Sequence, residues 1–146
     1  MSTAAFTVEI SALEPDVMAA FALTLNPELG SDAAVCDVVE EVLINPPEAP
    51  LDAGYELTGR TVRDVGFGRF VLNQEAVIHD EARFLAAVRS AYAKAWNEEF
   101  EPENLGHALY EIVVASNASP GPVEIGFEIL SHECRGEPVA PSAPAP

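Results

Sequence analysis

The sequence predicts an α+β fold: a two-layer sandwich in which a four-stranded, mainly antiparallel sheet carries four helices on one face. Three observations lead to this prediction. Some segments alternate polar and apolar residues, others repeat apolar residues at helical spacing, and the order strand–helix–helix–strand occurs twice. With 146 residues the chain has the length of one domain. We expect a single globular domain at residues 1–135 and a disordered Pro/Ala-rich tail at residues 136–146.

The first half is predicted to contain a strand, two helices and a second strand. Polar and apolar side chains alternate over residues 6–10, which is typical of a half-buried strand. Pro15 opens the first helix, because proline is favoured at the first helical position. Ser31 is expected to cap the second helix. A proline-rich loop at residues 46–53 then leads into a strand at residues 54–65.

The second half repeats this order after a glycine-rich hairpin turn at residues 66–68. A short strand is predicted at residues 68–72, and a fourth helix between Glu101 and Asn117. Alternating apolar residues over 123–129 predict the last strand. The longest helix is expected to run from Asp80 to about Asn97, with a core face made of Phe84, Leu85, Val88, Ala91, Tyr92, Ala95 and Trp96.

A sequence pattern shared by the two halves indicates an internal duplication. The pattern N-x-x-x-x-P-x-x-x-G-[Y/F]-E-[L/I] occurs at residues 45–57 and again at residues 117–129. We therefore expect pseudo-repeats at residues 4–65 and 67–132, related by a pseudo-two-fold axis near the hairpin. Two successive helices return the chain to its starting end, so the strands flanking each helix pair should run antiparallel. Strand order stays open, because either half could pair with itself or exchange strands with the other.

The shared pattern has a structural and a functional interpretation. In the structural one, the asparagine ends a helix in the left-handed conformation and proline prevents its continuation. Gly54 and Gly126 then allow a close approach of two backbones or a β-bulge. In the functional one, the equivalent loops at residues 45–53 and 117–122 form a paired binding surface.

The acidic and basic residues are unevenly distributed. The chain has 24 acidic residues against seven Lys and Arg, for a formal net charge of −17. Residues 1–59 contain no Lys or Arg, and six of the seven bases lie within residues 60–94. Such a field repels nucleic acid and acidic membranes and attracts basic partners. We expect no direct binding to nucleic acid or to a membrane.

No sequence motif indicates catalysis, a metal or a cofactor. Residues 132–134 place His, Glu and Cys side by side, but neighbours on a strand point to opposite faces. His79 and His107 are isolated, and Cys36 falls among apolar residues of a helix. The chain has no P-loop, no H-E-x-x-H and no C-x-x-C. We therefore expect no cofactor, and an enzyme is the less favoured class of protein.

The sequence favours a small acidic binding protein that regulates or inhibits a partner with a basic surface. One form of this hypothesis is nucleic-acid mimicry, in which carboxylates occupy the groove of a nucleic-acid-binding protein. A cytoplasmic location is expected, because no secretory signal is visible and two cysteines are too few for a disulfide framework. The carboxylates assigned to the partner are Asp32, Asp37, Glu40, Glu41, Glu48, Asp52 and Glu56.

Three other interpretations compete with this hypothesis. The chain could be a purely structural interaction module, with the Pro/Ala tail as a tether. The acidic surface could serve solubility alone. Alternatively, the chain is a small-molecule-binding domain or an enzyme, with its site between the two pseudo-repeats near the central arginines. Oligomeric state and the identity of the partner stay open.

Overall fold

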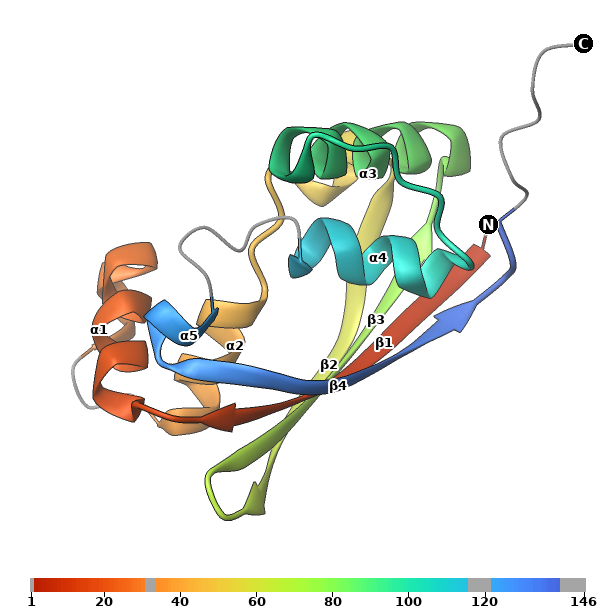
Figure 1. Ribbon diagram of the computed structural model, residues 1–146. Coiled ribbons are helices and arrows are strands. Elements are labelled where there is room, and N and C mark those ends of the chain that lie inside the picture. The colour runs from red at the N-terminus through yellow and green to blue at the C-terminus, as the bar shows by residue number, and fades with distance from the viewer. Residues whose placement is uncertain (1, 31–33, 116–121, 140–146) are drawn as a thin grey trace, which may run out of the picture.

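A four-stranded antiparallel sheet forms one layer of the fold, with its strands in the order β2-β3-β1-β4. The computed structural model describes residues 2–30, 34–115 and 122–139, and in Figure 1 the helices gather on one side of this sheet. The elements are β1 (Ser2–Ala12), α1 (Pro15–Leu25), η1 (Pro27–Leu29), α2 (Val35–Leu43), η2 (Pro50–Ala53), β2 (Tyr55–Gly66), β3 (Arg69–Ile78), α3 (Glu81–Trp96), α4 (Leu105–Val113), α5 (Pro122–Ile125) and β4 (Phe127–Gly136). The predicted α+β fold with a four-stranded antiparallel sheet is confirmed.

The two central strands, β1 and β3, supply much of the hydrophobic core. They pair from Ser2 opposite Ile78 to Ser11 opposite Arg69. Alternate residues of both strands are buried beneath the helices, while the residues between them keep partial exposure. Only one face of the sheet is therefore covered. The buried side chains are Ala4, Phe6, Val8, Ile10, Phe70, Leu72, Gln74, Ala76 and Ile78.

The two halves of the chain exchange strands. In the described residues β2 pairs with β3 and β4 pairs with β1, so each outer strand lies beside a strand of the other half. Because β1 and β2 both run antiparallel to β3, they run in the same direction as each other. The expectation that strands flanking a helix pair run antiparallel is wrong. The chain between α2 and β2 runs along the sheet before β2 begins, which sets this direction (Figure 1).

Two glycines hold equivalent positions just before the outer strands. Gly54 has φ +82° and its carbonyl accepts a hydrogen bond of 2.9 Å from the N–H of Asp80, the N-cap of α3. Gly126 has φ +105° and its carbonyl accepts a hydrogen bond of 2.8 Å from the N–H of Glu14, the N-cap of α1. The structural interpretation of these glycines as points of close backbone approach is confirmed. The duplication itself stays a prediction.

The start of the last strand differs from the prediction. Residues 123–126 were expected to be extended, but α5 is a helical turn and β4 begins only at Phe127. The N–H of Gly126 donates to the carbonyl of Pro122 at 3.0 Å, and its positive φ breaks the extended backbone. An apolar residue at every second position is also compatible with one helical turn that buries Ile125.

Other helices and strands of the second half also end at residues that differ from the prediction. β3 runs to Ile78, well beyond the predicted limit at residue 72, because the alternation continues through the buried amide of Gln74. Trp96, predicted for the core, is 50% exposed, and its indole N–H donates to Glu111 at 3.2 Å. It is the last residue of α3, and Ala95 before it, also predicted for the core face, is exposed as well. The expected helix end at Asn117 lies outside the described residues, and α4 ends at Val113.

Residues 136–139, assigned to the tail from the sequence, are hydrogen-bonded to the domain. The carbonyl of Glu137 accepts from the N–H of Leu105 at 2.9 Å, and the N–H of Val139 donates to the carbonyl of Glu103 at 3.2 Å. Residues 140–146 lie outside the described part of the chain. Among the helices that are described, none combines the length and apolar character required to cross a membrane.

Replacing either of the two equivalent glycines with alanine should lower stability by similar amounts. A Cβ at Gly54 would lie 2.6 Å from the carbonyl oxygen of Asp80, and one at Gly126 would lie 2.6 Å from that of Glu14. We expect each variant to lose about 3 kcal/mol in the free energy of unfolding, measured by urea denaturation.

Gly66→Ala is the matched control for this pair. Gly66 has φ +92°, but a Cβ added to it would have no neighbouring atom within 4 Å, so only backbone strain applies. A loss of about 1 kcal/mol is expected there. If all three variants lost the same amount, the close contacts at Gly54 and Gly126 would have no special role.

Candidate functional site

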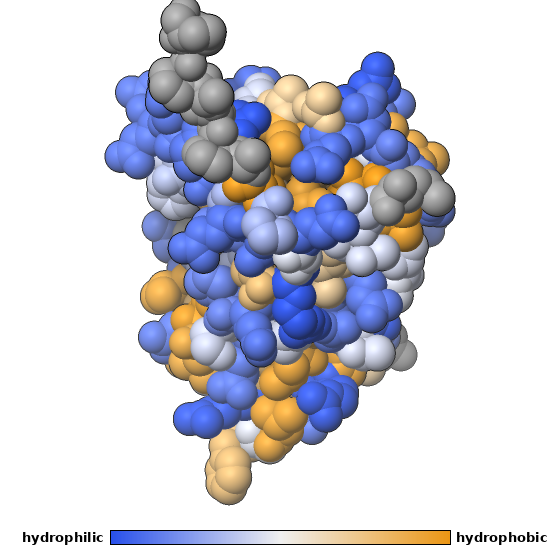
Figure 2. Space-filling model, turned by 90° about the vertical axis from the view of Figure 1, so that its right-hand side faces the viewer, coloured by the Kyte–Doolittle hydropathy of each residue, from blue (hydrophilic) through white to orange (hydrophobic). Residues whose placement is uncertain are grey.

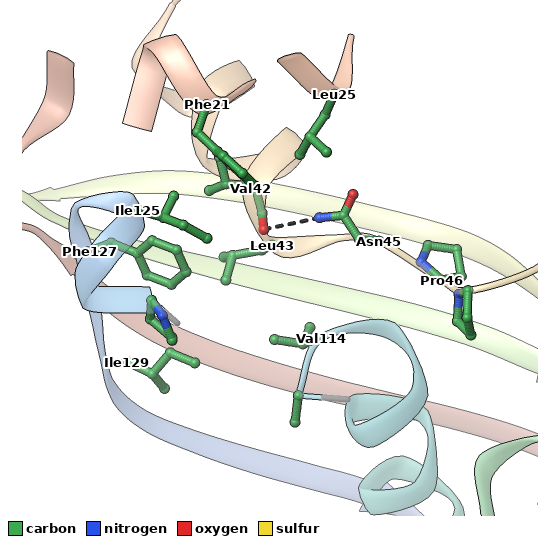
Figure 3. A pocket seen from close by; sticks show the side chains of 13 residues that line it. Phe21, Leu25, Val42, Leu43, Asn45, Pro46, Val114, Ile125, Phe127 and Ile129 are labelled. Atoms are coloured by element: carbon green, nitrogen blue, oxygen red, sulfur yellow. Dashed lines mark hydrogen bonds between the residues drawn. The ribbon is translucent and has the colours of Figure 1, made fainter. Parts of the chain in front are cut away.

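An apolar cleft of about 290 Å³ opens between the two halves of the chain. Figure 3 shows side chains from α1 and α2 on one side of it and side chains from α5, β4 and the residues just after α4 on the other. The cleft lies at the point where the C-terminal ends of α2 and α4 approach each other. It is lined by Phe21, Leu25, Val42, Leu43, Asn45, Pro46, Pro47, Val114, Ala115, Pro122, Ile125, Phe127 and Ile129.

Helical and strand periodicity place these side chains in the cleft. Phe21 and Leu25 are four residues apart on α1, so they share one face of the helix. Leu25 is 41% exposed although it is a large aliphatic residue. Phe127 and Ile129 are two residues apart on β4 and therefore point to the same side of the sheet. The cleft thus has an apolar floor that is partly open to water.

Asn45 joins the two halves at the edge of the cleft. Its backbone N–H donates to the carbonyl of Val113 at the end of α4, at 3.0 Å. Its side-chain amide donates to the carbonyls of Glu41 and Val42, each at 3.1 Å, which satisfies the last turn of α2 (Figure 3). The left-handed conformation predicted for this asparagine is wrong. Among the described non-glycine residues, positive φ occurs at Phe67 and Asn97.

The segments that form the cleft carry no basic side chain. Every lining residue belongs to residues 1–59 or 95–134, two stretches of the sequence without Lys or Arg. Acidic residues are frequent there: Glu48 follows Pro47 directly, and Glu41 and Glu124 precede Val42 and Ile125. The electrostatic potential around the cleft is therefore negative.

The carboxylates assigned to a partner from the sequence are spread along α2, the following loop and the start of β2. Asp37, Glu48, Asp52 and Glu56 are exposed, and Glu40 and Glu41 are half-buried. Asp32 lies outside the described residues. Of the six described carboxylates, Glu41 and Glu48 are next in sequence to residues that line the cleft.

Glu40 is already engaged in a polar network inside the protein. Its carboxylate pairs with the guanidinium of Arg60 on β2, at 2.5 Å. The Arg60 Nε donates to the side-chain carbonyl of the buried Gln74, and the Gln74 amide donates to the carbonyl of Glu75 at 2.8 Å. This network joins α2 to the sheet. None of the arginines at residues 60–94 lines the cleft, so the inter-half site predicted near them stays a prediction that this cleft does not test.

The histidines and Cys134 do not form a metal site in the described residues. His132 stacks on Tyr110 of α4, with ring centroids 4.6 Å apart, at the edge of the sheet. His79 lies 3.3 Å from the carboxylate of Glu56. Burial raises the pKa of the Cys134 thiol to about 11. Because the thiolate is the nucleophilic form, this thiol is a poor nucleophile at neutral pH.

Comparison with protein-family models, with curated proteins and with solved structures gave no match to this chain. The candidate site is therefore defined by its own geometry. A site between the two pseudo-repeats was one of the alternatives predicted from the sequence, but this lining was not, because its residues come from separate elements that only the fold brings together. The shared sequence pattern was the available signal, since Asn45 and Pro122 from its two copies both line the cleft.

The raised pKa of Cys134 predicts slow alkylation below pH 10. In a Cys36→Ser variant, the rate of reaction with iodoacetamide should rise with an inflection near pH 11, against 9 for the unfolded chain in urea. Between these values the native state binds more protons than the unfolded state, so the free energy of unfolding should fall as pH rises. Cys134→Ser should reduce that fall. An inflection near pH 9 in the native protein would contradict the burial of this thiol.

Proposed function

We propose that this is an acidic binding protein, which regulates or inhibits a partner by engaging a basic segment that carries apolar side chains. The observation that supports the proposal is the cleft: an apolar hollow formed only by segments without Lys or Arg. In this arrangement the cleft holds the apolar side chains and the surrounding carboxylates attract the cationic ones.

The size of the cleft fits one or two side chains of a partner. Its volume of about 290 Å³ lies at the lower limit for small-molecule sites. Burying one Leu or Phe side chain contributes about 1.5–3 kcal/mol. The partner side chain would lie against Leu25, Ile129 and Val114. A few such anchors commonly supply most of the affinity of an interface.

The carboxylates contribute mainly to the rate of association and to selectivity. A net charge of −17 attracts cationic segments over a distance of about one Debye length, about 8 Å at physiological salt. Glu41 and Glu48 would meet the basic side chains nearest the cleft. Asp37, Asp52 and Glu56 would add to the longer-range field. In the mimicry form of the proposal, the partner is a nucleic-acid-binding protein.

The second candidate function is the binding of a small apolar molecule in the same cleft. The apolar lining from Phe21, Ile125 and Phe127 favours it. For either function we propose a cytoplasmic location, which is supported by the unpaired state of both cysteines in the described residues.

Titration with designed peptides tests the proposal. An amphipathic Leu/Lys peptide labelled with fluorescein should bind, and a Leu/Glu peptide of equal length and apolar content should not. Affinity for the Leu/Lys peptide should fall as salt rises, because surface charges are screened. Fluorescence anisotropy at several salt concentrations measures both effects.

Matched tryptophan variants locate the binding site. Ala115→Trp places an indole in the cleft and should weaken peptide binding by about tenfold or more, since about 1.4 kcal/mol of anchor burial is lost. Ala86→Trp adds the same side chain at an exposed position of α3 and should leave affinity unchanged. Equal affinity of both variants would contradict the cleft as the site. Binding of Nile red without peptide binding would favour the small-molecule form.

A further inference from the structure

The tip of the β2–β3 hairpin carries a fully exposed aromatic residue. The side chain of Phe67 is 101% exposed, and it lies between Gly66 and Gly68. The hairpin projects from the body of the protein, away from the helices (Figure 1). In Figure 2 this lowest projection is hydrophobic, with hydrophilic residues above it on both sides.

Neither burial nor turn chemistry explains a phenylalanine at this position. Phe67 has φ +57° and Gly68 has φ +72°, as in a type I′ turn. Asn, Asp or Gly is preferred at the first central position of such a turn, and a bulky residue with positive φ is unusual. Phe67 therefore occupies an unfavourable conformation and also exposes its whole ring. A residue that departs from the conformational preference of its turn without stabilising the fold indicates a binding role.

The hairpin tip is held in place before any partner arrives. The Asp64 carboxylate accepts a hydrogen bond from the N–H of Gly66 at 2.9 Å. The carbonyl of Gly68 accepts another from the N–H of Ala12 on β1, at 2.8 Å. A preorganised loop loses little conformational entropy when it binds.

The tip also carries two arginines in a strongly acidic protein. Arg63 and Arg69 are both exposed, and among the described residues neither forms an ion pair. Arg63 pairs across the hairpin with Val71, and Val71 lies two residues from Arg69 on β3. The two guanidiniums therefore extend from the same face of the sheet. The tip thus combines an apolar anchor with basic side chains.

We propose that the hairpin tip of one copy of this chain docks in the apolar cleft of a second copy. Phe67 enters the cleft, and Arg63 and Arg69 meet the carboxylates of Glu41 and Glu48 at its edge. This inference rests on the proposed function, because it names the hairpin as a basic segment with an apolar side chain of the kind that the cleft accepts.

Size and charge support this match. A cavity of about 150 Å³ lined by aliphatic and aromatic residues accommodates benzene, and the cleft measures about 290 Å³. Each arginine faces a surface formed by segments without Lys or Arg. The tip and the cleft are different parts of the surface, so the contact is head-to-tail: it generates a closed ring if the rotation between copies closes, and a filament if it does not.

Head-to-tail docking gives the protein a way to regulate itself. A cleft occupied by Phe67 of a neighbour is closed to any other basic segment. Peptide binding and self-association would therefore compete, and the free cleft would predominate at low protein concentration.

The proposal is tested with two variants, each of which removes one side of the contact. Phe67→Asn removes the anchor and supplies a residue that the turn favours, so its melting temperature should be equal or higher. Ala115→Trp fills the cleft and leaves the tip intact. Sedimentation velocity in 150 mM salt, over roughly 0.01–1 mM protein, covers the range expected for a weak contact.

The expected result is growth of wild-type assemblies with concentration, and monomers for each variant alone. An equimolar mixture of the two variants retains one intact tip and one intact cleft, so it should form heterodimers and stop there. Leu51→Asn, at an exposed site outside the cleft, is the control and should assemble like the wild type.

A wild-type monomer at roughly 1 mM, or assembly of Phe67→Asn like that of the wild type, would overturn the proposal. Peptide binding by Phe67→Asn distinguishes the two proposals. If this variant still binds the Leu/Lys peptide while the wild type stays monomeric, the cleft is a binding site and self-docking is wrong.

A second experiment uses vesicles of phosphatidylcholine and phosphatidylserine. If the wild-type monomer bound these vesicles and Phe67→Asn did not, the tip would be assigned to lipid and self-docking would be overturned.

Discussion

The antiparallel pairing of β1 with β3 is the contact on which the rest of the structure depends. It places one central strand from each half side by side and aligns their buried faces under the helices. Both outer strands are then added to a strand from the opposite half. Because the halves are joined in this way, the ends of α2 and α4 meet, and the hydrogen bond from Asn45 to Val113 closes the junction. The cleft is the space that remains between the surrounding side chains.

Hydrogen bonds where the helices meet the sheet fix the positions of these elements more tightly than apolar packing alone would. The carbonyls of Gly54 and Gly126 bind the N–H groups at the starts of α3 and α1, so each helix begins at a defined point beside an outer strand. The Glu40–Arg60–Gln74 network does the same between α2 and the sheet. An unpartnered amide at Gln74 would be costly in the core, so this network also fixes the position of Arg60.

Local patterns predicted most of the elements, whereas long-range relations could not be predicted. The alternation in β1 and the start of α3 at Asp80 depend on neighbouring residues, and both were predicted. The start of β4 was missed because the alternation continues through Ile125, and only the positive φ of Gly126 ends it. The direction of β2 depends on the course of the segment between α2 and β2, and this segment has no repeating apolar pattern from which its course could be predicted. The cleft combines residues from both halves, so no single segment reveals it.

The placement of the outer strands has a consequence for the origin of the chain. A half-length polypeptide would leave its own last strand without a neighbour, because that neighbour comes from the other half. A single ancestral unit of this kind would have been an obligate homodimer with intertwined subunits. Fusion of two genes would then have turned a bimolecular assembly into an intramolecular one with a high effective concentration. Copies fused in this way would then be free to diverge in sequence, because each would no longer have to pair with an identical partner.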